Sequence, residues 1–331
     1  MVSLHYEVSA NMTTEDITLG IDISKKKFDV ALFRSGKLKH KSFHNDKHGF
    51  EYLAKWLADH QATKAHVCME SSGVYGEDLA EFLYDSGFQV SIVNPARVKG
   101  YAQSELKRSK TDKQDAGLIA RFCAAHRPEP WQPQAKEIRQ LRDLVRRLEA
   151  LNDMRQQELN RLEAAVGIVE EQLNRHISYL EKEIKETKAL INQHIDNHPT
   201  LKNKKQLLES IPGIGEVTIN VILSEFSDIS QFRNAKALAA FICVAPRVRQ
   251  SGTSLRERGM MSKMGRRALR KAFFMPALVA MRYNPSIIEL NQRLTEAGKP
   301  KMAIVGASMR KLIHIIYGVL KNEVPYDANY A

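Results

Sequence analysis

The order of secondary-structure signals in residues 17–126 constrains the fold of this 331-residue chain most. Three strand-like runs fill residues 17–43, and Ser35-Gly36 predicts a turn before the third. Apolar spacing then predicts a helix at 47–59, a strand at 65–69, a helix at 76–86, a strand at 89–93 and a helical region from Pro95 through His126. This order predicts a ribonuclease-H-like α/β domain, with a parallel sheet covered by helices on both faces.

Four acidic residues occupy positions where such a domain could bind metal. Asp22 and Glu70 each end a strand-like run, and Asp112 and Asp115 lie three residues apart where Thr111 is an expected N-cap. A helix places these two carboxylates on one face with Cβ atoms about 5–6 Å apart, which is unfavourable unless a cation lies between them. In such a sheet the first and fourth strands are neighbours, and the following helix can lay its acids over their ends. We therefore expect magnesium, as two ions roughly 3.5–4 Å apart, although a lone acid at a strand end is commonly a cap.

The charge of the chain indicates its partner. A net charge of +12 and a pI near 9.5 favour a polyanion. No run approaches the roughly eighteen apolar residues that span a bilayer, and residues 1–16 resemble a flexible leader rather than a signal peptide. Three widely spaced cysteines without a CxxC motif fit a reducing cytoplasm and argue against structural zinc.

The proline-rich segment 127–133 marks the end of the first domain, predicted over residues 17–130. Residues 138–195 contain no proline and repeat Leu or Ile at three- and four-residue steps, so a coiled-coil or helical arm is expected over 136–200, with a bend at Gly167. We favour a protruding arm used for self-association over a helical pair packed within one subunit, because its surface is so charged.

A mostly helical domain is expected over residues 201–331. It begins with Ser210-Ile-Pro-Gly-Ile-Gly215, which predicts a helix-hairpin-helix element. Gly213 and Gly215 would let backbone amides approach a phosphate at the second helix's N-terminus. The alternative is a tight helix–helix turn without a ligand.

The segment 247–271 holds nine basic residues and one acid, Glu257, so it carries a formal charge of +8. Its cations are the predicted nucleic-acid ligands: Arg247, Arg249, Arg256, Arg258, Lys263, Arg266, Arg267, Arg270 and Lys271. Between them lies Ser251-Gly252-Thr253-Ser254, a small-residue loop that a sugar–phosphate backbone can approach closely. The local sequence leaves open whether Ser251 contacts a phosphate or attacks it.

Several short motifs occur together in one order. They are Gly20-Ile-Asp22, Met69-Glu70, Asn94-Pro95, Lys110-Thr111-Asp112-x-x-Asp115-Ala116, Ser210-Ile-Pro-Gly-Ile-Gly215 and Gln250-Ser251-Gly-x-Ser254. In order and spacing the chain resembles the DEDD transposases of the IS110 family of bacterial insertion sequences, over nearly all of residues 17–326. The resemblance implies a RuvC-like domain, a coiled-coil connection and a C-terminal transposase domain. It also implies that Asp22, Glu70, Asp112 and Asp115 are the metal-binding tetrad and Ser251 the nucleophile.

The resemblance further implies a DNA recombinase that forms a 5′-phosphoserine intermediate. Its cofactors would be Mg²⁺, with Mn²⁺ as a possible substitute, and a bridge RNA whose loops pair with double-stranded target and donor DNA. Dimers would assemble into a tetramer in the bacterial cytoplasm, at the nucleoid. The acids of one subunit would face the serine of another.

Two other functions fit the residues. A RuvC-like structure-specific endonuclease would use the same acids with metal-activated water and would not need Ser251. A non-catalytic nucleic-acid scaffold would use the acids only to stabilise its fold.

Overall fold

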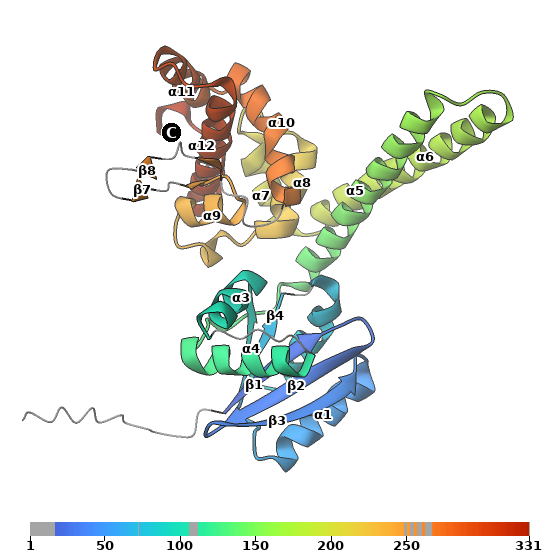
Figure 1. The fold of residues 1–331 in the computed structure, drawn as a ribbon. Helices are drawn as coiled ribbons and strands as arrows, with labels where there is room; N and C mark the ends of the chain where they lie inside the picture. The colour runs from blue at the N-terminus through green and yellow to red at the C-terminus, as the bar shows by residue number, and fades with distance from the viewer. Residues whose placement is uncertain are drawn as a thin grey trace, which may run out of the picture. The chain divides into compact units, whose positions relative to one another are not determined.

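The computed structural model describes residues 17–71, 73–105, 112–247, 250–251, 255–256, 260–261 and 267–330. The chain divides into two compact units, Met1–Pro133 and Gln134–Ala331. The first is a mixed α/β unit and the second is mostly helical (Figure 1). The arm and the C-terminal domain that the sequence predicts as separate parts both fall in the second unit.

The first unit contains a five-stranded sheet in the order β3-β2-β1-β4-β5. Its strands are β1 (Thr18–Ile23), β2 (Lys27–Arg34), β3 (Lys37–His44), β4 (His66–Glu70) and β5 (Gln89–Val93). The sheet is mixed, so the expectation of a parallel sheet was wrong. Short turns join β1, β2 and β3, which forces antiparallel pairing, whereas β1, β4 and β5 are parallel.

Helices lie on both faces of this sheet (Figure 1). One face packs in an apolar core with α1 (Lys47–Asp59) and α2 (Glu77–Asp85), and the short 3₁₀ helix η1 (Gly73–Gly76) precedes α2. The other face packs with α3 (Pro95–Ser104) and α4 (Asp112–His126). Helix α3 ends at Ser104 and α4 begins at Asp112. Thr111, the expected cap of α4, lies outside the described residues.

In the second unit a hairpin of two long helices comes first. Helix α5 (Lys136–Leu162) and helix α6 (Ile168–Asp196) pack against each other along their length (Figure 1). Gly167 has a φ of 63°, and the chain reverses there rather than bending. Buried leucines and isoleucines of the two helices form the seam between them. An ion pair also joins the helices, with Arg155 of α5 2.8 Å from Glu181 of α6. The buried seam of the arm therefore lies between two helices of one chain, and use of the arm for self-association stays a prediction.

The remaining helices form one apolar core with the base of this hairpin. They are α7 (Pro199–Glu209), α8 (Glu216–Phe226), α9 (Ala235–Phe241), α10 (Arg267–Tyr283), α11 (Pro285–Glu296) and α12 (Lys301–Asn322), with 3₁₀ helices η2 (Ile229–Gln231) and η3 (Ala328–Tyr330). By length and composition α12 is long and apolar enough to cross a membrane, but 61% of its most apolar window is buried inside the protein. It serves as the central helix of this core.

The described part of the basic segment forms two short antiparallel ladders. Strand β6 (Pro246–Arg247) pairs with β9 (Met260–Met261), and β7 (Gln250–Ser251) pairs with β8 (Leu255–Arg256). Gly252, Thr253 and Ser254 of the predicted small-residue loop lie outside the described residues. The pairing of Ser251 with Leu255 places the predicted nucleophile at the end of a narrow β-ribbon.

Candidate catalytic acids and nucleophile

Asp22 and Glu70 lie side by side at the carboxyl edge of the sheet. Strands β1 and β4 are parallel neighbours, and Ile21 pairs with Met69. The residues that follow this pair, Asp22 and Glu70, are therefore level with each other and point to the face opposite Ile21 and Met69. Ile21 and Met69 belong to the core under α1 and α2, so the two half-buried acids lie on the α4 face.

Helix α4 runs antiparallel to β1 across that face. Thr18, at the start of β1, donates a hydrogen bond from Oγ1 to Ala120 O at 2.8 Å. Two residues later, a Cβ built on Gly20 would lie 2.1 Å from Ala116 O and 2.3 Å from Ala120 N. The absence of a side chain at Gly20 is what lets the helix approach so closely.

This contact places the N-terminal turn of α4 beside Asp22. Asp22 lies about 6.6 Å beyond Gly20 along the strand, and Asp112 lies about 6 Å before Ala116 along the helix. Asp112 and Asp115 therefore reach the same end of the sheet as Asp22 and Glu70. Asp115 is half-buried, and the side chain of Asp112 lies outside the described residues. The backbone thus brings the four predicted acids to one edge, which we call the acid edge.

Asn45 links the two loops that follow Asp22 and Glu70. Its Nδ2 donates to Ser24 O at 3.1 Å and to Tyr75 O at 2.9 Å. Its backbone amide donates to Lys26 O at 3.0 Å. Sequence reasoning missed this residue, because nothing in its local pattern shows that it bridges segments 21 and 30 residues away.

Asp29 is a fifth acid that the sequence analysis did not select. It pairs with Asp22 in the antiparallel register of β1 and β2, so both side chains leave the same face of the sheet. Asp29 is only 6% exposed. Its Oδ2 lies 3.0 Å from Lys27 Nζ, and its Oδ1 accepts a hydrogen bond from Ser42 Oγ. The alternating pattern of residues 28–33 indicates that Asp29 lies in a strand, but only the strand register shows that it is a neighbour of Asp22.

The acid edge fits magnesium in its donor chemistry. Carboxylate oxygens are the hard ligands that Mg²⁺ accepts, and a protein usually supplies only a few of them beside water and phosphate. Among the described side chains, which do not include that of Asp112, no group of three or more His, Cys, Asp or Glu is arranged to hold a metal ion.

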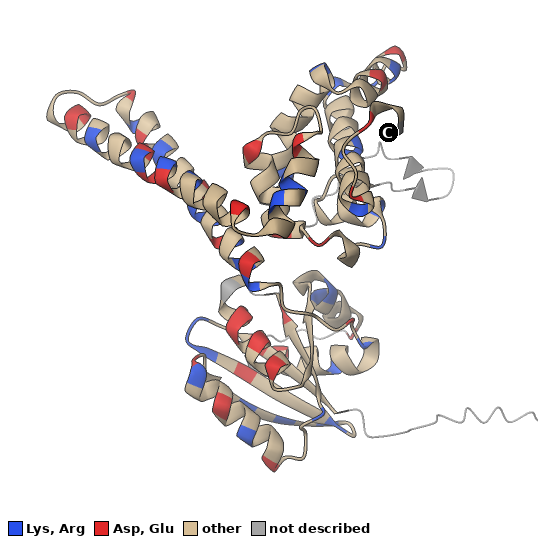
Figure 2. Cartoon of the chain, turned by 180° about the vertical axis from the view of Figure 1, so that it is seen from behind, with Lys and Arg blue, Asp and Glu red and all other residues tan. Residues whose placement is uncertain are grey.

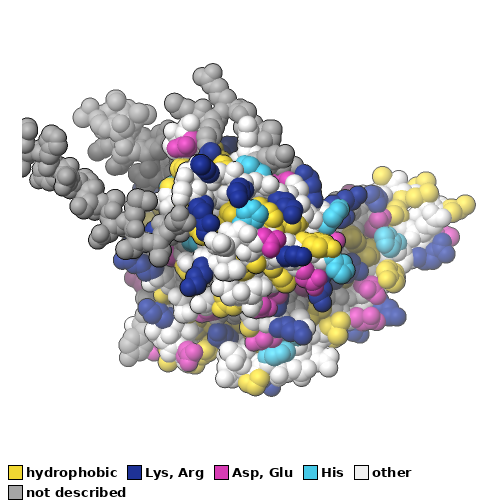
Figure 3. Space-filling view, turned by 90° about the horizontal axis from the view of Figure 1, so that it is seen from below, with side chains coloured by type: hydrophobic (Ala, Val, Ile, Leu, Met, Phe, Trp, Pro, Cys, Tyr) yellow, Lys and Arg dark blue, Asp and Glu magenta, His cyan; other side chains and the backbone are white. Residues whose placement is uncertain are grey.

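Little of the predicted basic surface can be placed. Arg270 is half-buried, and Lys271 is exposed with its Nζ 4.0 Å from Asp153 Oδ1 of α5. For Arg247, Ser251, Arg256 and Arg267 only the backbone is described. Arg249, Arg258, Lys263 and Arg266 lie outside the described residues. Elsewhere, blue and red residues alternate along the hairpin in Figure 2, and basic and acidic side chains are interspersed on the face in Figure 3.

The glycines of the helix-hairpin-helix turn have different surroundings. A Cβ on Gly213 would lie 2.7 Å from Ala280 Cα of α10, and Gly213 has a φ of 101°. Close packing and backbone conformation therefore explain Gly213 without any ligand. Gly215 is the N-cap of α8, and a Cβ there would meet no heavy atom within 4 Å. Only Gly215 has open space at the helix N-terminus.

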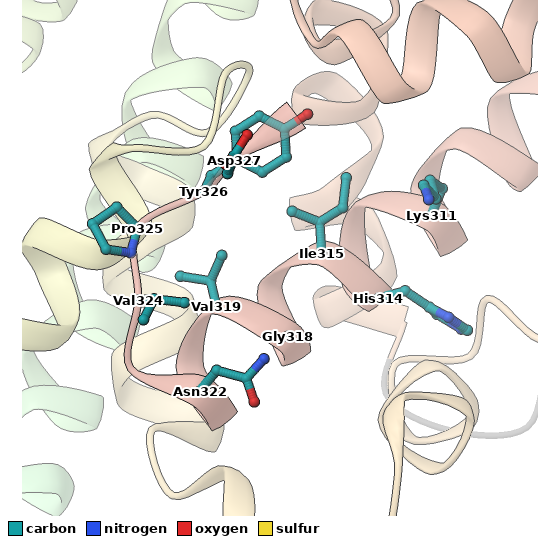
Figure 4. A pocket seen from close by; sticks show the side chains of 10 residues that line it. All are labelled: Lys311, His314, Ile315, Gly318, Val319, Asn322, Val324, Pro325, Tyr326 and Asp327. Atoms are coloured by element: carbon teal, nitrogen blue, oxygen red, sulfur yellow. The ribbon is translucent and has the colours of Figure 1, made fainter. Parts of the chain in front are cut away.

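The chain end holds this turn in place. Tyr326 N donates to Ser210 Oγ at 2.8 Å, and Tyr326 Oη donates to Asn284 Oδ1 at 3.0 Å. Asn284, which is fully buried, donates in turn to Pro212 O at 3.3 Å. Tyr326 also lines a pocket of about 520 Å³, where Ile315 and Val319 of α12 lie across from the tail residues Val324 and Pro325 (Figure 4).

Comparison with known proteins assigns the chain to a family. Residues 19–169 match a DEDD transposase family model, and residues 205–292 match the transposase family IS116/IS110/IS902. A pilin gene-inverting protein of Moraxella bovis is 35% identical over 313 residues, which cover 93% of this chain and 97% of that protein. The chain belongs to the IS110 transposase family.

Two further similar proteins are consistent with this family assignment. The pilin gene-inverting protein of Moraxella lacunata is also 35% identical over 313 residues, covering 93% of this chain and 97% of that protein. An uncharacterized 43.6 kDa protein of insertion element IS110 from Streptomyces coelicolor is 28% identical over 140 residues, 42% of this chain and 33% of that protein. As an IS110-family transposase the chain is an enzyme that cleaves and rejoins DNA, which rejects the non-catalytic scaffold. The first family match contains all four predicted acids, and the second contains Ser251.

Proposed function

We propose that this IS110-family transposase is a RuvC-like, metal-dependent serine recombinase. The observation that carries the proposal is the convergence of Asp22, Glu70, Asp112 and Asp115 at one edge of the sheet. The sheet order, with the first and fourth strands adjacent, is the order expected for a ribonuclease-H-like domain. Ser251 on its ribbon is the proposed nucleophile.

The acids at the edge would hold two divalent ions, Mg²⁺ or in its place Mn²⁺. When bound, these ions would polarise the scissile phosphate and stabilise the leaving oxygen. Asp22 and Glu70 sit on paired strands, and Asp112 and Asp115 on a helix that packs closely on Gly20, so the backbone that carries the four acids is fixed before a substrate arrives. Asn45 fastens the loops beyond both strands.

Ser251 Oγ would attack the phosphorus and form a serine–phosphate ester while the bond to the 3′ oxygen breaks. The hydroxyl proton passes to a base, and the released 3′ oxygen takes up a proton. Apart from Glu257, no carboxylate lies near Ser251 in the sequence. A serine hydroxyl needs a base or a metal ion to activate it, and we assign this role to the acid edge. Attack of a 3′ hydroxyl on the phosphoserine reverses these bonds, frees Ser251 and rejoins DNA without ATP.

We extend the proposal to the partners that the family resemblance implies. A bridge RNA would read double-stranded target and donor DNA by base pairing, while the protein binds backbones through charge and shape. The basic segment 247–271 supports this role. The two relatives named as gene-inverting proteins support recombination that rejoins both cut ends.

We also propose that dimers assemble into a tetramer in the bacterial cytoplasm, at the nucleoid, with the acids of one subunit facing the serine of another. The tip of the helical hairpin supports self-association. Val166 is 80% exposed, Ile168 77% and Val169 56%, which is a concentration of apolar surface at one turn. The hairpin would act as the coiled-coil connection of the family.

The runner-up is a RuvC-like endonuclease in which water attacks. The acid edge supports this alternative, because attack by metal-activated water needs the acids but no serine. Ser251→Ala separates the two: a serine recombinase loses strand cleavage by about a thousandfold or more, whereas a water-using nuclease retains it. Asp112→Asn with Asp115→Asn should abolish cleavage in both cases.

RNA guidance has its own test. The full chain is purified with its native element expressed in the same cells, and the nucleic acid that remains bound is sequenced. A discrete structured RNA with segments complementary to two DNA sites supports the proposal. Recovery of unrelated RNA only, from protein that recombines DNA after nuclease treatment, contradicts it.

A further inference from the structure

Three consecutive lysines, Lys25 to Lys27, follow β1, and the third forms an ion pair with Asp29. Lys25 and Lys26 are exposed. Lys27 begins β2, its side chain is 49% exposed, and its Nζ lies 3.0 Å from Asp29 Oδ2. The turn itself is closed by Ser24, whose amide and hydroxyl both donate to Lys27 O, at 2.9 and 2.7 Å.

Strand geometry places this ammonium group on the face that carries Asp22. Lys27, Asp29 and Ala31 alternate along β2, so they share one face, and Ala31 clusters there with Ala116 of α4. Asp29 is directly opposite Asp22, with Cβ atoms about 4.5–5.5 Å apart. A cation bound to Asp29 is therefore within a few ångströms of the carboxylate of Asp22.

The pair is more than a surface ion pair. The side chain of Asp29 is 8% exposed, and a buried carboxylate is costly unless both oxygens have partners. Lys27 satisfies one oxygen and Ser42 the other. The fold thus maintains a buried negative charge beside the acids and a lysine that neutralises it.

We propose that Lys27, held by Asp29, is the built-in counter-ion of the acid edge and competes with the divalent cation. Its positive charge offsets the repulsion among the carboxylates when metal is absent. The same positive charge lowers the affinity of the acid edge for a divalent cation. The negative charge of Asp29 partly cancels the charge of Lys27 and so raises that affinity. This inference rests on the proposed function, because it takes the acid edge as the metal site.

The test measures Mn²⁺ binding to the full chain without nucleic acid, by isothermal titration or by the loss of free Mn²⁺ signal in electron paramagnetic resonance. Removing a charge a few ångströms from a divalent ion in a solvated site should change affinity roughly three- to tenfold. Lys27→Met should tighten binding by that factor, and Asp29→Asn should weaken it. The double variant Lys27→Met with Asp29→Asn should return near the wild-type affinity.

Lys26→Met is the matched control, since it removes the same charge from the exposed side of the same turn. Its affinity should stay within about twofold of wild type because solvent screens its charge. A second readout is the melting temperature in chelator: Lys27→Met should lower it, and added Mn²⁺ should restore it. Generic damage to the fold would weaken metal binding in Lys27→Met, which is the opposite sign.

The outcomes separate this inference from the proposed function. If Asp22→Asn abolishes Mn²⁺ binding but Lys27→Met leaves it unchanged or weaker, the counter-ion role is wrong and the metal site stands. If wild type and Asp22→Asn bind Mn²⁺ alike, or neither binds, the metal site and the counter-ion role both fail. If Lys27→Met alone does not fold, the double variant still tests the inference. An Mn²⁺ affinity of the double variant that differs from the wild-type affinity by tenfold or more overturns it.

Discussion

Gly20 of β1 packs directly against Ala116 of α4, with the position of a Cβ on Gly20 only 2.1 Å from Ala116 O. This contact sets the height of α4 over the sheet. Because Asp22 follows Gly20 by two residues and Asp112 precedes Ala116 by four, one close contact brings acids that are 90 residues apart in sequence to the same edge.

Gly20→Ala should therefore harm both stability and chemistry. The added methyl overlaps backbone atoms, and we expect a loss of about 3 kcal/mol in the free energy of unfolding. Shifting α4 should also lower metal-dependent cleavage at temperatures where the variant is folded. Gly100→Ala is the control, because a Cβ on Gly100 of α3 meets nothing within 4 Å. It should be neutral or stabilise by up to about 1 kcal/mol, as measured by urea unfolding.

The two glycines of the helix-hairpin-helix turn should respond differently to alanine. Gly213→Ala should destabilise the protein by about 2–3 kcal/mol, because of its positive φ and its contact with Ala280. Gly215→Ala should cost less than about 1 kcal/mol. If Gly215 approaches a phosphate, Gly215→Ala should weaken DNA binding and reduce the salt slope by about one unit. Unchanged binding would show that the turn is a structural element only.

Acidification should destabilise the protein through two histidines. Burial, with a smaller contribution from Arg127, lowers the pKa of His66 below 6.5, and burial together with nearby cations, chiefly Arg310, lowers the pKa of His314. The folded state keeps these groups neutral where the unfolded chain binds protons, so stability is complete above pH 6.5 and falls as the pH drops below it. Thermal unfolding between pH 7.5 and 5.5 measures this. His66→Gln should show a smaller fall over that range, and an identical fall would contradict the assignment.

The buried thiol of Cys123 should be inert. A hydrogen bond with Cys68 and burial raise the pKa of Cys123 well above its ordinary value, so the reactive thiolate is not populated at neutral pH. Alkylation by iodoacetamide at pH 8 should be roughly a hundredfold slower in the folded protein than in urea. Peptide mass spectrometry follows each cysteine separately. Rapid labelling of Cys123 in folded protein would mean that α4 detaches readily from the sheet.

Sequence patterns predicted the elements of the first unit well, because three strands, two further strands and their helices each have a clear local period. Asp22 and Glu70 were found because acids directly follow apolar runs. Asp29 and Asn45 were missed because their roles depend on cross-strand register and on a bridge between distant loops. The mixed sheet and the reversal at Gly167 are likewise tertiary outcomes, since leucine spacing is the same in one long helix and in a hairpin.

Trapping the covalent intermediate tests most directly whether the acid edge serves attack by Ser251. A DNA substrate nicked near the cleavage site traps the intermediate, and mass spectrometry of the digested complex identifies the residue linked to the 5′ phosphate. We predict a phosphodiester on the peptide that contains Ser251, formed only with divalent metal and absent in Asp112→Asn with Asp115→Asn. Cleavage that yields free 5′ phosphate with no DNA linked to Ser251 would contradict the account.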